Sequence, residues 1–162
     1  MWWPGKIPAG TVCNELSTTM DILPTLAHLA GTEPPKDRII DGHDIRPLMF
    51  SRSGIESPYE VFYYYQGKQL QAVRSGRWKL FLPVDSFSSH PHFKSEDEVK
   101  PLLFDVVNDI SSSVNVAGQH PEVLKRLMQF AEDAREDLGE KGVNGKNVRS
   151  VGHVDSPIPI KE

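Results

Sequence analysis

Apolar residues recur at helical spacing in two separate stretches of the chain. In the first stretch they lie three and four residues apart, at Ile22, Leu23, Leu26, Leu29 and Ala30. This pattern predicts a helix over residues 17–30 with one apolar face. Thr18 and Asp21 have the spacing of a capping box at its start, and Gly31 is placed to end it in a left-handed conformation.

The second stretch predicts the longest helix of the chain. Pro121 suits the first helical position and Gly139 is placed to stop the helix. The apolar stripe between them has the helical period, with Val123, Leu124, Leu127, Met128, Ala131, Ala134 and Leu138. Such a stripe needs an apolar partner within the same fold.

Between the two helices the pattern changes to short runs rich in β-branched and aromatic residues. These runs predict four strands, at residues 61–65, 70–74, 77–82 and 102–106. Turns at 66–68 and 75–76 are short enough to join antiparallel strands. The fold class expected is therefore α+β, with a four-stranded antiparallel sheet packed against the C-terminal helix.

The polar segment 51–58 contains Gly54 and Pro58 and marks the change from helical to strand-like pattern. We therefore expect a boundary after residue 50, a small domain over 51–140, and a tail over 141–162. The tail is rich in Gly and Pro, with little to bury, so it either wraps the body or stays loose.

Composition removes several classes of partner. The net charge is −4 and no basic face is evident, which argues against nucleic acid. The apolar runs are only a few residues long, so no membrane span is expected. The first residues lack a basic segment followed by an apolar one, so no signal peptide is predicted. Cys13 is the one cysteine, which excludes an intrachain disulfide.

Several polar clusters allow both a functional and a structural interpretation. Asp41, His43 and Asp44 contain metal-ligating groups, but a solvated turn capped by Asp41 explains them more simply. Asp105 and Asp109 suggest a carboxylate pair, and side-chain bonds to a strand-end turn are the alternative. The residues 63–65 are three tyrosines, for which cross-strand packing is favoured over a stacking platform.

Five stretches resemble, in order and spacing, motifs of the sulfatase family of the arylsulfatase A-like type. They are residues 3–10 (WPGKIPAG), 21–31 (DILPTLAHLAG), 41–48 (DGHDIRPL), 72–80 (AVRSGRWKL) and 103–123, which begins LFDV and ends HPEV. Each stretch alone is weak evidence for the family, but together the five stretches cover about residues 2–139. Ile110 and Ser112 depart from the family pattern, which often has Pro and Glu there.

The resemblance implies a large α/β domain of the alkaline phosphatase type followed by a small C-terminal domain. Residues 1–50 then resemble the end of the large domain, with its last helix and connection, while 51–140 resemble the small domain. On this interpretation the chain is a C-terminal portion that begins just ahead of Trp2. Its implied partner is the N-terminal sulfatase domain.

The implied activity is hydrolysis of a sulfate ester on a sulfated small molecule or glycan. The family nucleophile is a formylglycine made from Cys or Ser in a C/S-x-P-x-R motif, and a bound Ca²⁺ assists it. Cys13 is followed by Asn14, Glu15 and Leu16, so it does not match that motif. No catalytic or metal residue is therefore expected within this chain, and both cofactors are expected upstream. Family habit suggests export of the full-length protein.

One loop carries candidate substrate-binding residues. In sulfatases the loop after the WKL strand often reaches the mouth of the pocket, where a histidine can contact substrate. His90 is the nearest match and His92 the alternative. A merely exposed histidine is the structural interpretation of either residue.

Two further interpretations remain open at this point. The chain could be a stand-alone, non-catalytic interaction module, or part of a phosphodiesterase or phosphonate hydrolase of the same superfamily. A portion of a larger enzyme should expose Trp2, Trp3 and the apolar face of the helix over residues 17–30, because their partner surface lies elsewhere. A self-contained module should bury them.

Overall fold

The computed structural model describes residues 1–50, 54–84, 92–93, 100–150 and 154–156. The chain divides into two compact units. The first unit comprises Met1–Phe62, Arg74–Lys79 and Phe104–Val114, and the second comprises Tyr63–Val73, Leu80–Leu103 and Asn115–Glu162.

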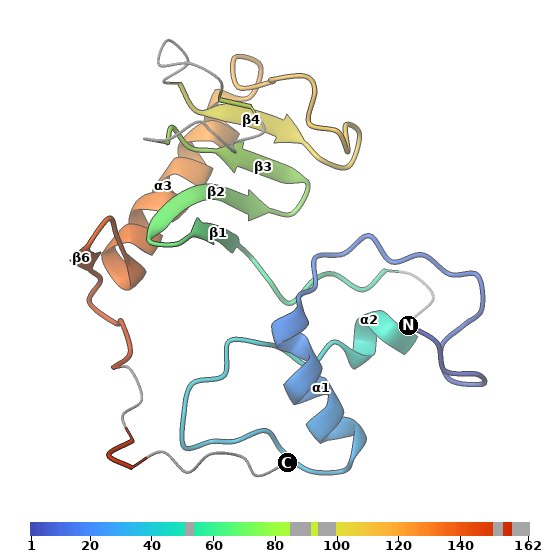
Figure 1. Cartoon of the computed structure of the whole chain (residues 1–162). Helices are drawn as coiled ribbons and strands as arrows, with labels where there is room; N and C mark the ends of the chain where they lie inside the picture. Colours follow the sequence, from blue (N-terminus) through green and yellow to red (C-terminus); the bar gives the residue numbers. More distant parts are fainter. Residues whose placement is uncertain (51–53, 85–91, 94–99, 151–153, 157–162) are drawn as a thin grey trace. The chain divides into compact units, whose positions relative to one another are not determined.

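The main element is a four-stranded sheet in the order β1-β2-β3-β4 (Figure 1). Its strands are β1 (Phe62–Gln66), β2 (Gln69–Ser75), β3 (Trp78–Phe81) and β4 (Leu102–Asp105). Two-residue turns join β1 to β2 and β2 to β3, which requires antiparallel pairing. The predicted sheet is therefore confirmed. The second turn lies at Gly76 and Arg77, one residue later than expected, and Gly76 supplies its positive φ of 53°.

Helix α3 (Pro121–Leu138) lies against the sheet and confirms the second predicted helix (Figure 1). Leu127, Ala131 and Ala134 of its apolar stripe are buried. The Tyr65 hydroxyl of β1 donates to the Gly139 carbonyl at 3.1 Å, which ties the end of the helix to the sheet. The core of the fold lies between these elements.

Leu138 was predicted to belong to the buried stripe, and this prediction is wrong. Its side chain is 44% exposed. The helix ends at Leu138, and the chain turns away at Gly139. Leu138 lines a shallow groove of about 340 Å³ with Val143 and Val148.

The beginning of the tail is a small hairpin, which the sequence analysis did not identify. It consists of β5 (Gly139–Glu140) and β6 (Val143–Asn144), paired antiparallel. Lys141 donates its N–H to the Lys68 carbonyl at 2.8 Å, and Glu140 accepts the Leu70 N–H at 3.0 Å. This part of the tail is therefore wrapped onto the β1–β2 turn.

The N-terminal part contains a 3₁₀ turn, η1 (Thr19–Asp21), followed by helices α1 (Ile22–Leu29) and α2 (Arg46–Phe50). The helix predicted over residues 17–30 is thus present, and Gly31 follows it with a φ of 75°. Among the described residues, no helix is long and apolar enough to cross a membrane.

Candidate functional site

The most connected polar group of the N-terminal part is the carboxylate of Asp21. Its side chain is fully buried. It accepts hydrogen bonds from the Thr18 N–H at 2.6 Å, from the His43 N–H at 2.8 Å and from the Tyr59 hydroxyl. A buried carboxylate is tolerated only with such partners, so Asp21 joins three segments that are distant in sequence.

The local sequence explains how Asp21 reaches this position. Thr18 caps η1, since its hydroxyl accepts the Met20 N–H at 3.1 Å while Asp21 accepts the Thr18 N–H in return. This reciprocal pair is the predicted capping box. One carboxylate oxygen remains directed at the loop that contains His43.

Gly42 allows that loop to approach. A Cβ atom at this position would lie 2.0 Å from the Met20 carbonyl oxygen, a distance that no side chain tolerates. Glycine is therefore required for close contact between the two backbones. Asp21 of the second motif and Gly42 of the third thus belong to one structural unit, with the His43 N–H bonded to Asp21.

Thr25 makes a second connection, one helical turn after Asp21. It is 4% exposed, and its hydroxyl oxygen accepts the Ile45 N–H at 3.0 Å. Asp21 and Thr25 together bind two backbone N–H groups of the 41–45 loop. The side of α1 that faces the rest of its unit is therefore polar.

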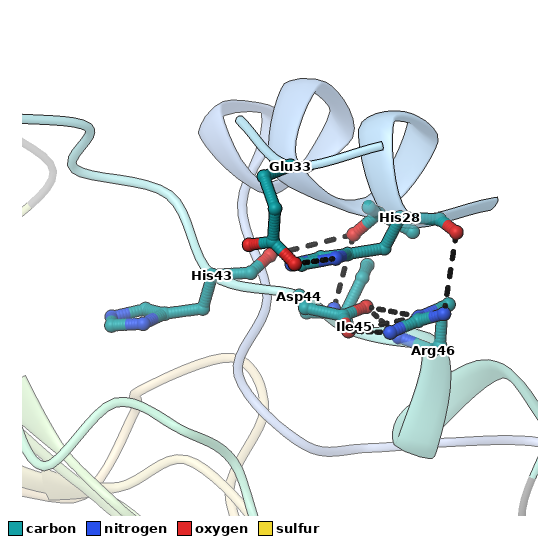
Figure 2. A network of polar contacts seen from close by, with 7 residues as sticks. His28, Glu33, His43, Asp44, Ile45 and Arg46 are labelled. Carbon is teal, nitrogen blue, oxygen red and sulfur yellow. Dashed lines mark hydrogen bonds and ion pairs between the residues drawn. The ribbon is translucent and has the colours of Figure 1, made fainter. Parts of the chain in front are cut away.

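An ion pair closes the loop at its far end. Figure 2 shows Arg46 between Asp44 and the end of α1. Its Nε lies 2.8 Å from the Asp44 carboxylate, and the guanidinium also reaches the His28 carbonyl at 3.4 Å. The adjacent guanidinium holds the pKa of Asp44 below its ordinary value.

The metal interpretation of Asp41, His43 and Asp44 finds no support in this arrangement. The Asp44 carboxylate is occupied by Arg46, and the His43 side chain points away from it in Figure 2. Within the described part of the chain, no three His, Cys, Asp or Glu side chains gather where a metal could bind. The described residues therefore do not fit the Ca²⁺ site that the family resemblance implies.

Tyr59 completes the network from the segment that precedes the sheet. Its ring lies edge-on to the His43 imidazole, with centroids 4.6 Å apart. Partial burial, followed by the hydrogen bond to Asp21, raises the pKa of Tyr59 to about 12. The hydroxyl thus remains a proton donor to Asp21 throughout the neutral range.

The opposite side of α1 is apolar and exposed. Ile22, Leu23 and Leu26 are 50%, 52% and 57% exposed. Of the first 50 residues, only Asp21, Pro24, Thr25 and Ile45 are buried. The apolar side chains of α1 line one wall of a groove of about 720 Å³, which Trp2, Trp3 and Met49 also line.

The predicted substrate-binding histidines lie elsewhere in the sequence. His90 falls outside the described residues. His92 is half-buried, and its ring contacts Phe81 of β3 edge-on, with centroids 4.6 Å apart. His92 and the Asp21 network belong to different compact units. The cysteine that the sequence analysis set aside, Cys13, is exposed and free.

The carboxylates of Asp105 and Asp109 accept backbone hydrogen bonds in the turn after β4, as the structural interpretation predicted. Asp105 accepts the N–H of Val107 at 3.3 Å and forms a bidentate pair with Arg77 at 2.5 and 3.0 Å. Asp109 accepts the N–H groups of Ser113 and Val114, and these bonds help to lower its pKa. Neither carboxylate has the surroundings of a general acid or base.

The sequence analysis expected an exposed apolar face on α1 if the chain is a portion of a larger enzyme, and the structure shows it, but the buried polar side was not identified. A signal was present, because Thr18, Asp21, Thr25 and His28 follow one another at intervals of three and four. This polar stripe has the same helical period as the apolar one. The periodicity alone could not show which of the two stripes is buried.

Comparison with known proteins gives the same family as the sequence motifs. The profile of the C-terminal region of aryl-sulfatase matches residues 57–152. N-acetylgalactosamine-6-sulfatase of Canis lupus familiaris is 45% identical over 158 residues, which covers 85% of this chain and 30% of that enzyme. Steryl-sulfatase of Homo sapiens is 39% identical over 126 residues, covering 66% of this chain and 21% of that enzyme.

Solved structures show the same fold. The sulfatase PsFucS1 of Pseudoalteromonas sp. superimposes with a TM-score of 0.65 at 22% identity, over 82% of this chain and 28% of that one. The chain thus spans less than a third of the length of these relatives. Because the family profile covers more than half of the chain, with relatives above 40% identity, the chain belongs to the sulfatase family and corresponds to its C-terminal region.

Proposed function

We propose that this chain is the C-terminal part of an enzyme that hydrolyses sulfate esters, and that it contributes structure rather than the reacting groups. The match of residues 57–152 to the C-terminal region of aryl-sulfatase carries the proposal. The sequence has no C/S-x-P-x-R motif for a formylglycine, and the described residues do not fit a calcium site. Nucleophile and Ca²⁺ are therefore assigned to another part of the polypeptide.

Exposed apolar surface supports this proposal over a self-contained interaction module. Such a module should bury its aromatic and aliphatic side chains, yet Trp2 is 87% exposed and Leu26 is 57% exposed. A contiguous apolar surface of this kind is characteristic of an interface.

The experiment is an assay of aryl sulfate hydrolysis by the purified 162-residue chain and by a longer polypeptide that adds a formylglycine-containing region. We expect no turnover by the chain alone, with or without Ca²⁺, and turnover by the longer polypeptide. Activity that follows the chain alone through purification contradicts the proposal. Preference of the longer polypeptide for a phosphodiester or a phosphonate would instead favour the related hydrolases.

The substrate class that we propose is a sulfated sugar. The canine relative at 45% identity is named for N-acetylgalactosamine 6-sulfate, whereas the human relative at 39% identity is named for steryl sulfate. Assay of the longer polypeptide with both compounds tests the choice. A higher kcat/KM for the steryl ester would contradict it.

His90 and His92 are proposed to contact the substrate from the rim of the pocket in the longer enzyme. For His92 the support is its position in the loop after β3, where Phe81 orients the ring. His92→Ala and His90→Ala should raise KM more than they lower kcat. His120→Ala, in the segment before α3, serves as the matched control and should change neither constant.

A further inference from the structure

The hairpin at the beginning of the tail contains an asparagine that is followed by glycine, in the sequence Val143-Asn144-Gly145. Of the five asparagines in the chain, only Asn144 has glycine as its next residue. Asparagine is chemically labile because the backbone nitrogen of the next residue can attack its side-chain carbonyl carbon. A side chain on that next residue hinders the attack, and glycine has none. The sequence therefore places its most reactive asparagine in β6.

The structure leaves the side chain of Asn144 able to rotate. Asn144 is exposed, and within the described part of the chain no hydrogen bond holds its side chain. The side chains of Asn108, Asn115 and Asn147, in contrast, are each held by at least one hydrogen bond. Rotation into a geometry that permits attack costs these three residues a hydrogen bond, whereas Asn144 has none to lose.

The fold itself requires glycine at position 145. A Cβ atom there would lie 2.2 Å from the Asp137 carbonyl oxygen, in the last turn of α3. The next two residues, Lys146 and Asn147, donate their N–H groups to carbonyl oxygens of the same turn, at 2.8 and 3.0 Å. The close packing of segment 143–147 on α3 therefore depends on Gly145. The same glycine leaves the preceding asparagine without steric protection.

We propose that Asn144 is a site of spontaneous deamidation, and that the reaction releases segment 143–147 from α3. The Gly145 nitrogen gives up its proton and bonds to the Asn144 Cγ atom, the Cγ–Nδ2 bond breaks, and ammonia leaves with that proton. Water then opens the resulting five-membered imide at either of its two carbonyl carbons. One opening gives aspartate, and the other gives isoaspartate, in which the main chain runs through the former side-chain carbon. Water is the co-reactant, and nothing is oxidised or reduced.

The position of Asn144 in the hairpin sets how easily the reacting atoms meet. Asn144 is the last residue of β6, which has two residues and pairs with β5. The Gly145 nitrogen reaches the Asn144 Cγ atom when Asn144 leaves its extended backbone conformation, so the end of this short strand has to open. Opening at the end of a short element costs little free energy. The fold therefore slows the reaction without preventing it.

The consequence for the tail follows from the lengthened main chain of isoaspartate, which gains one methylene group before Gly145. Asn144 is the register partner of Gly139, and a Cβ atom on Gly139 would lie 2.5 Å from the Gly145 nitrogen. The two backbones are thus in close contact, and the extra methylene group has no room between them. Gly145 is therefore displaced from α3, and the N–H groups of Lys146 and Asn147 lose their acceptors.

The experiment incubates the full 162-residue chain at neutral and at mildly alkaline pH and follows it by tryptic digestion and mass spectrometry. Cleavage after Lys141 and Lys146 releases a peptide, 142–146, in which Asn144 is the sole asparagine. The gain in mass measures conversion, and methylation by a protein isoaspartate methyltransferase identifies isoaspartate. Hydrogen exchange of the Lys146 and Asn147 N–H groups measures release of the segment from α3.

We expect Asn144 to convert at least about tenfold faster than Asn108, whose amide donates to Asp105 at 3.1 Å. The rate should rise with pH, and the isoaspartate form should exchange the two N–H groups faster than the unconverted chain. Conversion of Asn108 at an equal rate overturns the inference. So does an Asn144 that stays intact in the folded chain while it converts in the urea-unfolded chain. Unchanged exchange in the isoaspartate form overturns the release from α3.

Two variants at position 144 separate the chemistry from its structural effect. Asn144→Gln keeps a side-chain amide, but attack would have to close a six-membered ring, so its mass and its slow exchange should both persist. Asn144→Asp has the charge of the product on a main chain of normal length, and directly after purification it should still protect the two N–H groups. Circular dichroism should show both variants folded, because position 144 is exposed. Loss of protection in Asn144→Asp equal to that of the isoaspartate form overturns the lengthened main chain as the cause of release.

Discussion

The two principal helices of this chain bury opposite faces: α3 buries its apolar face, and α1 buries its polar face. In α3 the centre of the apolar stripe is buried against the sheet, with Leu127 fully buried, and charged residues face the solvent. In α1 the polar Asp21 and Thr25 are buried, while Leu26 is 57% exposed. Both helices have a regular apolar stripe in the sequence, so the stripe itself does not reveal where its partner lies.

The difference shows which helix has its partner within the chain. The sheet supplies an apolar face to α3, and the hydrophobic effect holds the two together. Helix α1 is held by hydrogen bonds between its polar side and the 41–45 loop. A helix that is attached by its polar side keeps its apolar side available for an interface.

The largest expected effect contrasts one leucine from each helix. Leu127→Ala should destabilise the chain by about 2–5 kcal/mol, because it leaves a cavity in a packed core. Leu26→Ala should change stability by less than about 0.5 kcal/mol, as substitutions of exposed residues do. Urea unfolding followed by circular dichroism measures both. Equal losses would mean that the two helices are packed alike.

Removal of the Asp21 carboxylate, the central hydrogen-bond acceptor of the network, tests how α1 is attached to the 41–45 loop. Asp21→Ala leaves the N–H groups of Thr18 and His43 without their acceptor, while the Tyr59 hydroxyl keeps its contact with the Thr18 hydroxyl at 3.2 Å. We expect a loss of about 3 kcal/mol, since each unpaired buried donor costs roughly 1–3 kcal/mol and part of the segment relaxes toward water. Asp37→Ala is the control, because Asp37 is exposed and pairs with its neighbour Arg38. A loss no greater than that of the control would show that the network does not hold the loop.

The close approach at Gly42 offers a steric test of the same attachment. Gly42→Ala places a methyl group within 2.0 Å of the Met20 carbonyl oxygen, so the loop has to move away from η1. The expected cost is about 1–3 kcal/mol, typical of a side chain forced into a filled space. Gly118→Ala is the matched control, because nothing lies within 4 Å of its Cβ position. Thermal unfolding of the two variants gives the comparison.

The smallest effect concerns the hydroxyl of Tyr59. Tyr59→Phe removes the hydrogen bond to Asp21 and the 3.2 Å contact with the Thr18 hydroxyl, and it should cost about 1 kcal/mol near neutral pH. The pKa of Tyr59 is raised from 10 to about 12, so the folded state retains the proton longer than the unfolded state does. The stabilisation from the hydroxyl is therefore complete below pH 10 and is lost as the pH rises through 12. The stability difference between wild type and variant, measured from pH 8 to 12, should shrink over that interval. A constant difference would mean that the hydroxyl ionises normally.

Much of the small domain could be predicted from the sequence. The four strands, α3 and the glycines at its turns follow from residue patterns that are local. The hairpin of β5 and β6 was missed because its strands have two residues each, which is too short for any periodicity. Leu138 was misplaced because the helical period does not show which residues of the stripe stay exposed at the end of the helix.

For the candidate site, the sequence identified the motifs but not how they combine. Asp21, Gly42 and Tyr59 belong to segments that are separated by about 20 and 40 positions, and the bonds between them are long-range. The domain boundaries at residues 50 and 140 and the role of His92 stay predictions. The substrate-binding assignment of His90 also stays a prediction, since that residue lies outside the described part of the chain.

The sequence by itself determined the sheet and the two principal helices, the family and the absence of a formylglycine motif, because these depend on residue identity and on spacing along the chain. Only the tertiary structure decided which side of α1 is buried. An amphipathic helix has two faces of the same period, and the choice between them depends on what each face meets in space. Here the polar face meets the backbone N–H groups of His43 and Ile45. The apolar face of α1 is consequently left open at the groove.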